Sequence, residues 1–264
     1  MISTAELADG FARLGVRPGT VLHVQASLRT LGPVEGGAAG VVDALLEVLG
    51  EEGTLVAFTS TPENSSTSRI HQAATAGLTP AEIAEHRARM PRFDPATTPA
   101  SPTLGALSEA VRTRPGALRS SHPQTSWAAL GPRAEEITSR HPLTSHLGPD
   151  SPLGRLYELD ARVLMLGVDM ARFTAFHLAD LRQADVRHRE YGCVTTDGWM
   201  SFQAPDLDDL HFAELGAEVL AAAEGVTTGR IGDADCRLVP VQEAVDLADG
   251  LLRARARARA RASG

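Results

Sequence analysis

The sequence predicts a globular protein of the α/β class. Residues 21–59 alternate strand, glycine-rich loop, helix and strand, and this order suggests a βαβ-like unit. A continuous apolar run in Ala161–Val168 predicts a buried strand, and a helix is expected directly after it. The 264 residues include 43% hydrophobic and 22% charged residues, which are ordinary globular values. Collagen-like, disordered and disulfide-scaffold proteins are therefore excluded, and a single domain with a sizeable core is plausible.

The N-terminal quarter contains the clearest local patterns. Helical spacing of Leu7, Phe11 and Leu14 predicts an amphipathic helix over Thr4–Leu14, capped by Thr4 and ended by glycine. The βαβ-like unit is then expected to comprise the strand Val21–Val24, the loop Gly32–Gly37, the helix Val41–Leu49 and the strand Thr54–Thr59.

The segment that follows is polar and irregular. One helix is predicted over Pro80–Arg89, started by Thr79 or by the proline in its first turn. Four prolines within Pro91–Pro102 predict an extended loop. Because the segments on both sides of this loop look like one continuous fold, we expect the loop to be functional and not a linker.

The second half of the chain repeats short helices and strands. Helices are predicted over Leu104–Arg112, Pro132–Ser139, Thr174–Arg182, Asp209–Ala223 and Val241–Arg261. A hairpin is expected from Glu190–Thr195 and Trp199–Phe202, short extended pieces within Gly225–Leu238, and a turn or short extended piece over Ala117–Ser126. We expect one domain over residues 1–250 and an Arg/Ala-rich C-terminal tail over 251–264, frayed or solvated because its alternate arginines cannot share one helix face.

Charge and cysteine usage narrow the class of partner. The formal net charge is −8, the chain contains no lysine, and five of its arginines lie in the C-terminal tail. Such an acidic body repels nucleic acid and anionic membranes and favours a cationic substrate. No run approaches the ~20 apolar residues of a membrane span, and the N-terminus lacks a signal peptide, so a cytoplasmic protein is expected. Cys193 and Cys236 form no Cys-x-x-Cys pair, which argues against structural zinc.

His177 and Ser27 are the residues best placed for chemistry. His177 follows the strongest predicted strand, where α/β proteins place functional residues, and it shares a helix face with Asp180. The alternative is a structural histidine beside a solvated aspartate. Ser27 follows the first strand and would make a hydrolase with His177, although no Gly-x-Ser-x-Gly elbow occurs and a capping role explains it equally. Gly36 and Gly37 precede a helix and either bind an anion or only cap it.

Nine segments, taken in order, resemble the aminoglycoside 3-N-acetyltransferase family. They are His23–Leu28, Leu31–Gly37, Gly53–Val56, Phe93–Ser101, Leu104–Glu109, Arg119–Pro123, Gly148–Leu153, Leu166–Val168 and Thr174–His177. The resemblance covers about residues 5 to 245. It implies an α/β fold with a mixed β-sheet and helices on both sides, an α/β/α sandwich.

The resemblance also implies an activity. Members of the family transfer acetyl from acetyl-coenzyme A to an amine, usually the 3-amino group of the 2-deoxystreptamine ring of an aminoglycoside antibiotic. The role would be resistance or biosynthesis, in a monomer or homodimer that needs no metal. Coenzyme A is expected against Ser27, Leu28, Val34, Gly36, Gly37, Thr98, Ser101, Leu104 and Gly105, with His122 and Ser126 nearby.

His177 matches the family's catalytic histidine, the general base that would deprotonate the amine. The usual motif there is Thr-x-His-x-x-Glu, and this chain has Asp180 in the last position. Asp180, Asp206 or Asp208 would support His177, and Asp180 and Asp208 would hold the acceptor. The alternative for Asp206 and Asp208 is an N-terminal helix cap before Leu210. Ala26 also stands where the family has a serine. Two alternatives stay open, a serine-hydrolase-like enzyme and a non-catalytic amine-binding protein on the same fold.

Overall fold

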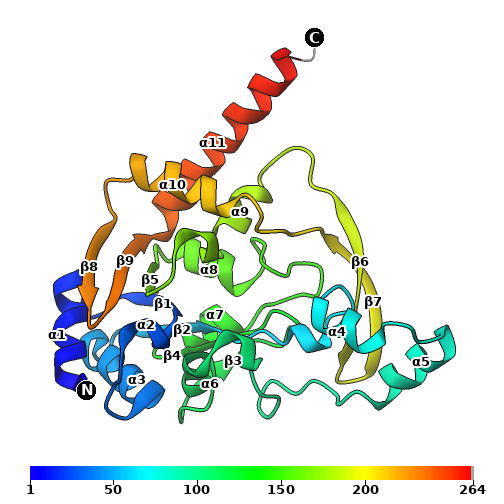
Figure 1. Ribbon diagram of the computed structural model, residues 1–264, viewed down its shortest axis with the longest axis horizontal. Coiled ribbons are helices and arrows are strands. Elements are labelled where there is room, and N and C mark those ends of the chain that lie inside the picture. Colours follow the sequence, from blue (N-terminus) through cyan, green and yellow to red (C-terminus); the bar gives the residue numbers. More distant parts are fainter. Residues whose placement is uncertain (263–264) are drawn as a thin grey trace.

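A seven-stranded mixed sheet forms the centre of the molecule in the computed structural model, which describes residues 1–262 (Figure 1). In spatial order its strands are β3 (Leu118–Arg119), β4 (Trp127–Leu130), β2 (Thr54–Phe58), β1 (Val21–Ala26), β5 (Arg162–Leu166), β9 (Ala234–Pro240) and β8 (Thr227–Ile231). The central strand β1 runs parallel to β2 and β5, while β4 and β9 pair antiparallel to these neighbours. The predicted parallel β1–β2 unit and the mixed sheet are confirmed.

Helices cover both faces of this sheet. The helices of the described chain are α1 (Thr4–Leu14), α2 (Leu28–Leu31), α3 (Gly37–Leu49), α4 (Arg69–Thr75), α5 (Pro80–Arg89), α6 (Ala106–Arg112), α7 (Ala134–Thr138), α8 (Pro152–Glu158), α9 (Phe176–Asp180), α10 (Phe212–Ala222) and α11 (Val241–Ala262), of which α4 and α5 lie away from the sheet. Side chains alternate along each strand, so Leu164 packs with the α1, α3 and α6 core, and Val163 with the core of α7 to α11. The predicted sandwich is therefore confirmed.

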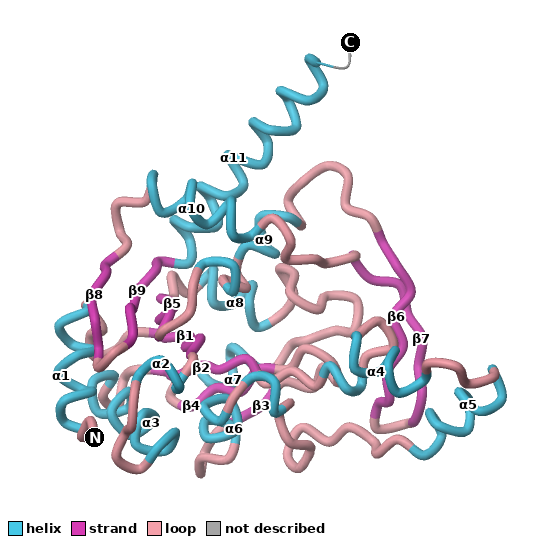
Figure 2. Tube along the Cα trace, viewed as in Figure 1, coloured by secondary structure: helices cyan, strands magenta, loops and turns pink. Residues whose placement is uncertain are grey.

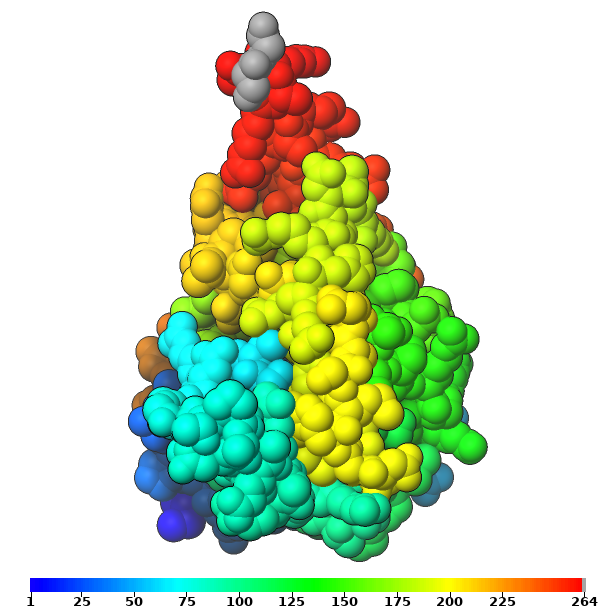
Figure 3. Space-filling model, turned by 90° about the vertical axis from the view of Figure 1, so that its right-hand side faces the viewer, coloured from blue at the N-terminus to red at the C-terminus, as the bar shows by residue number. Residues whose placement is uncertain are grey.

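A separate hairpin stands beside the sheet. Strands β6 (His188–Thr195) and β7 (Gly198–Pro205) pair only with each other among the described residues and extend the predicted hairpin at both ends (Figure 2). Asn64 anchors it, because its Nδ2 donates to the Val194 carbonyl and its Oδ1 accepts from the Val194 amide, both at 2.7 Å. Figure 3 shows the segment of α4 and α5, in cyan, lying against the hairpin, in yellow.

Some local predictions were wrong. The N-cap of α1 is Ser3 and not Thr4: the Ser3 hydroxyl accepts from the Glu6 amide at 3.2 Å, and the Glu6 carboxylate accepts from the Ser3 amide. Thr79 makes the same capping box with Glu82 at α5, as predicted. Strand β4 and helices α2, α4 and α8 were not predicted, because elements of four to seven residues show little periodicity. The irregular segment before residue 93 thus contains α4 as well as the one helix expected there.

The C-terminal helix α11 is continuous through Ala262 and projects from the body (Figure 1). Its last turns are exposed to solvent, as expected, but they stay helical through residue 262 instead of fraying. Arg255 at its middle bonds to Glu214 and Glu218 of α10 at 3.0 and 2.6 Å. The boundary expected at residue 250 falls inside this helix, and residues 263–264 of the predicted tail lie outside the described residues. Within the described part, no helix combines the length and apolar character needed to cross a membrane.

Candidate active site

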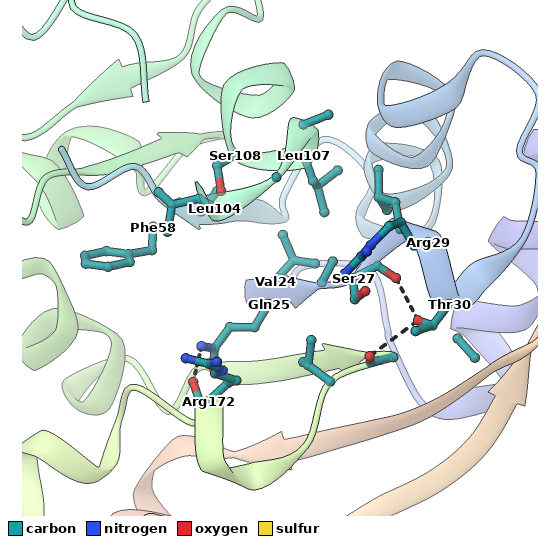
Figure 4. A pocket seen from close by; sticks show the side chains of 18 of the residues that line it. Val24, Gln25, Ser27, Arg29, Thr30, Phe58, Leu104, Leu107, Ser108 and Arg172 are labelled. Atoms are coloured by element: carbon teal, nitrogen blue, oxygen red, sulfur yellow. Dashed lines mark hydrogen bonds between the residues drawn. The ribbon is translucent and has the colours of Figure 1, made fainter. Parts of the chain in front are cut away.

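A cavity of about 1390 Å³ opens where β1 and β5 end (Figure 4). Five segments contribute to its wall: residues 24–30 at the end of β1 and in α2, residues 57–58 at the end of β2, residues 102–108 before and in α6, residues from the loop 167–172 after β5, and residues from 233–237 at the β8–β9 turn and the start of β9. Parallel strands present their carboxyl ends at one sheet edge, which is where α/β proteins bind ligands. The topology therefore creates this site from segments far apart in sequence.

Four of the predicted coenzyme A contacts line the cavity, namely Ser27, Leu28, Leu104 and Gly105. The Ser27 amide donates to the Leu166 carbonyl at 2.9 Å and so prolongs the β1–β5 pairing. Ser27 is also the N-cap residue of α2, but its side chain makes no capping hydrogen bond. Within residues 1–262 it shares no hydrogen bond with His177, so the serine–histidine pair that a hydrolase needs is not formed.

Gly167 brings the loop after β5 close to α2. A Cβ atom at Gly167 would lie 1.8 Å from the Thr30 Oγ1, and its φ of +66° favours glycine. The Thr30 hydroxyl donates to the Ser27 carbonyl at 2.7 Å (Figure 4). This close approach shapes the cavity wall between the two segments.

Three arginines, Arg29, Arg172 and Arg237, line the cavity. None of the three makes an ion pair within the part of the chain that is described. Three aspartates line it as well: Asp169 accepts from the Ala171 amide at 3.0 Å, Asp235 lies 3.7 Å from Arg230, and Asp233 makes no ion pair within residues 1–262. None of the three aspartates lies within 4 Å of the guanidinium group of Arg29, Arg172 or Arg237. The cavity therefore offers guanidinium groups that are free to bind an anionic ligand.

The other predicted loop residues lie outside the cavity wall. Val34 forms an isolated bridge with Ile2, Gly36 is the N-cap of α3, and Gly37 is the first residue of that helix. The two glycines thus form the start of α3, as the capping alternative expects. Ser101 is buried and supports the wall indirectly, because its hydroxyl accepts from the Thr103 amide at the start of the Pro102–Leu104 turn.

Thr98 and Ser126 are held by a half-buried arginine. Arg119 donates to the Ser126 hydroxyl at 3.0 Å, to the Thr59 carbonyl at 2.6 Å and also to the Thr98 carbonyl. Burial lowers the pKa of the Arg119 guanidinium to about 10. Arg119 thus attaches the proline-rich loop to the end of the sheet. Neither Thr98 nor Ser126 is among the residues that line the cavity.

His122 is a core residue in this structure. It is fully buried, and its ring lies 4.6 Å from the rings of both His141 and His146. Its Nδ1 accepts from the amides of Gln124 and Thr125, which leaves the proton on Nε2. Burial and the two neighbouring imidazoles lower the His122 pKa well below its usual value. His122 is therefore not among the residues that line the cavity.

His177 lies in the short helix α9, which follows β5 by one loop. The residue is 8% exposed, and its ring packs at 4.8 Å from that of Phe212. His177 Nδ1 is 3.7 Å from Asp180 Oδ2, and Asp180 is the one carboxylate within 4 Å of it in residues 1–262. The other Asp180 oxygen accepts from His211 Nε2 at 2.9 Å.

The remaining acidic candidates lie elsewhere. Asp206 is 3.2 Å from Arg189 and makes no contact with His177, so the predicted grouping of His177, Asp180 and Asp206 is not assembled here. Asp208 Oδ1 lies 3.8 Å from His211 Nδ1. His211 was not predicted as a site residue, although it is a histidine that lies two residues after the acidic run Asp206–Asp209.

The cavity and His177 are connected through one turn. Gln25, which lines the cavity, donates to the Thr174 hydroxyl at 2.9 Å and to the Arg172 carbonyl. The amide of His177 in turn donates to the Thr174 carbonyl at 3.2 Å. Within the described residues no group of three or more His, Cys, Asp or Glu side chains is arranged to hold a metal ion.

Comparison with known proteins identifies the family of this chain. The family model described as aminoglycoside 3-N-acetyltransferase matches residues 23–253. An aminoglycoside N(3′)-acetyltransferase-like protein of Bacillus subtilis, YokD, is 33% identical over 248 residues, which are 92% of this chain and 89% of that protein. A solved structure titled as the AAC-IIIb binary complex with CoASH is 31% identical, covers 96% of this chain and 97% of its own, and has a TM-score of 0.79. Another, titled AAC-VIa bound to sisomicin, is 30% identical over 96% of this chain and 98% of its own, with a TM-score of 0.82. The chain therefore belongs to the aminoglycoside 3-N-acetyltransferase family of acyltransferases.

Proposed function

We propose that this protein transfers the acetyl group of acetyl-coenzyme A to an amino group of an aminoglycoside, the 3-amino group of 2-deoxystreptamine or a related amine. The observation that carries the proposal is the cavity with three unpaired arginines, joined through Gln25 and Thr174 to the turn that bears His177. The complexes of related proteins with CoASH and with sisomicin support both substrates. A coenzyme A donor also agrees with the expected cytoplasmic location.

The cavity suits the donor by charge and shape. Coenzyme A carries phosphate groups, and arginine forms strong, often bidentate hydrogen bonds to phosphate. We place the phosphates near Arg29, Arg172 and Arg237, with Ser27, Leu28, Leu104 and Gly105 as the contacting wall. The residues that lie behind this wall, such as Ser101, would act by holding it in place.

His177 would act as the general base. An ammonium group cannot attack a thioester, so the amine must lose a proton, and we assign its transfer to His177 Nε2. The amine nitrogen then forms a bond to the acetyl carbonyl carbon, and the carbon–sulfur bond breaks. Coenzyme A leaves as a thiolate and takes up the second proton that the nitrogen loses on acylation, while His177 passes the first proton to solvent. A positioned base contributes about 10²–10⁴ in rate.

The acceptor would be bound by carboxylates. The chain has a net charge of −8, and aminoglycosides are polycations. Asp180 and Asp208, both near His211, would face the ammonium groups of the acceptor.

Thiol release tests the proposal. Purified protein is incubated with acetyl-coenzyme A and a panel of aminoglycosides that contain 2-deoxystreptamine, and free thiol is followed with a chromogenic disulfide. We expect saturable release with at least one acceptor and loss of turnover in His177→Ala with donor binding within a few fold. Amine binding without thiol release would favour the amine-binding protein, and labelling of Ser27 by a fluorophosphonate would favour the hydrolase.

A further inference from the structure

We propose that His211 is a positioning residue for acetyl transfer. It holds Asp180 so that the second carboxylate oxygen faces Nδ1 of His177. The inference rests on the proposed function, because it concerns the residue assigned there as the base. His211 itself lies outside the cavity wall.

The hydrogen bond between His211 and Asp180 joins two helix ends. Asp180 is the last residue of α9, and His211 immediately precedes α10. Phe212 is buried and contacts both imidazoles, with its ring 4.8 Å from that of His177 and 5.0 Å from that of His211. The packed ring fixes the spacing of the two histidines, and the bond at 2.9 Å fixes Asp180 between them.

His177 has an unmet hydrogen bond at the atom that faces Asp180. Its Nδ1 is buried and has no partner within 1–262, while Asp180 Oδ2 is 3.7 Å away. A shift of about 1 Å would bring the pair to hydrogen-bond length, and such contacts often tighten only when substrate binds. Because His211 occupies Oδ1, the oxygen left for His177 is Oδ2.

This arrangement selects one tautomer of His177. A carboxylate beside Nδ1 favours the proton on that nitrogen, which leaves the Nε2 lone pair free to accept the proton of the amine. Asp208 Oδ1 lies 3.8 Å from Nδ1 of His211, so each ring nitrogen of His211 has a carboxylate oxygen within 4 Å. Without His211, the Asp180 carboxylate is free to rotate toward solvent.

Other charged groups near α9 have partners of their own. From α11, Asp246 accepts from Arg182 at 2.7 Å and Asp249 accepts from Gln183 at 2.9 Å. Asp206 lies 3.2 Å from Arg189. Asp180 is therefore the carboxylate available to His177, and His211 is the group that orients it.

The test combines kinetics with ¹⁵N NMR of labelled histidine. In His211→Ala we expect kcat to fall roughly 10-fold to 100-fold, less than the full contribution of a base because Asp180 remains. The KM for acetyl-coenzyme A should stay within about twofold, since His211 does not line the cavity. His211→Gln, whose amide can still donate to Asp180, should recover most of kcat.

The ¹⁵N shifts of His177 report which ring nitrogen carries the proton. We expect the Nδ1–H tautomer in the wild type and in His211→Gln, and a mixture in His211→Ala. His188→Ala is the matched control, because His188 is an exposed histidine whose ring bonds only to the Val186 carbonyl within the described chain. Thermal unfolding checks that each variant is folded.

The outcomes separate this inference from the proposed function. An unchanged kcat together with an unchanged tautomer in His211→Ala overturns the role of His211, even if His177→Ala is inactive. A tautomer change in a protein without transferase activity keeps the positioning of His177 and rejects the proposed reaction.

Discussion

Gln25 Nε2 donates a hydrogen bond to Thr174 Oγ1 at 2.9 Å, although the two residues are 149 positions apart. Gln25 lies on the central strand and lines the cavity, and Thr174 starts the turn that leads to His177. The bond therefore couples the position of the proposed donor to that of the proposed base.

Loss of this hydrogen bond should lower kcat clearly but change the free energy of unfolding only slightly. In Gln25→Ala we expect kcat to fall roughly tenfold, because proper alignment of two substrates makes a large contribution to the rate. The free energy of unfolding should drop by only about 1 kcal/mol, the usual net value of a hydrogen bond. Steady-state kinetics and urea denaturation measure the two effects, and an unchanged kcat would refute the coupling.

The three cavity arginines should control affinity for the donor. Arg29→Ala, Arg172→Ala and Arg237→Ala should each raise the KM for acetyl-coenzyme A by about 3-fold to 10-fold, since each removes a charge-assisted hydrogen bond at a partly solvated site. Repeating the assay with the dephospho donor identifies the arginine that meets the 3′-phosphate, because that variant then loses its effect. Arg133→Ala, which removes an exposed arginine paired with Glu136, is the control and should leave KM unchanged.

The buried histidines should make the fold sensitive to acid. Burial lowers the pKa of His23 and His141 to about 4 and that of His146 to about 3, whereas in the unfolded chain each would have the ordinary value of 6.5. Between these values the unfolded state binds more protons, so stability is full above pH 6.5 and falls as the pH drops toward 4. Between pH 6.5 and pH 4, each buried histidine should lower the free energy of unfolding by roughly 3 kcal/mol.

Urea denaturation at a series of pH values measures how steeply the free energy of unfolding changes with pH. In His23→Leu, the dependence should be flatter by up to about 1.4 kcal/mol per pH unit, since one titrating group is gone. His188→Leu, at an exposed position, should keep the wild-type slope. Equal slopes in all three proteins would contradict the assignment of His23 as a buried neutral base.

Gly167 should tolerate no side chain. Gly167→Ala places a Cβ 1.8 Å from the Thr30 hydroxyl and at positive φ, so we expect a loss of about 2–4 kcal/mol in stability and a weaker donor site. Gly77→Ala is the matched control: its φ of +77° imposes the same kind of backbone strain, but nothing lies within 4 Å of the added Cβ. The difference between the two variants measures the close contact alone, and the double variant Gly167→Ala/Thr30→Ala should recover part of it.

Local sequence signals were sufficient for elements that are long or strongly patterned. The helix Thr4–Leu14, the helix Pro80–Arg89 with its Thr79 cap, and the β6–β7 hairpin were all predictable from periodicity, capping residues and turn residues. Strand β4 was not, because its stability comes from pairing with β2 and from the burial of Trp127. That information resides in residues about 70 positions away.

For the site, motifs that are contiguous in the chain were enough to predict the family and the fold class, and they also led to the proposal of His177 as the base. Which side chains contact one another could be seen only in the folded protein. The fold buried His122 with two other histidines, paired Asp206 with Arg189, and placed His211 on Asp180. The physical reason is that these contacts depend on how α9, α10 and the hairpin pack against one another, and a single sequence carries no local record of that packing.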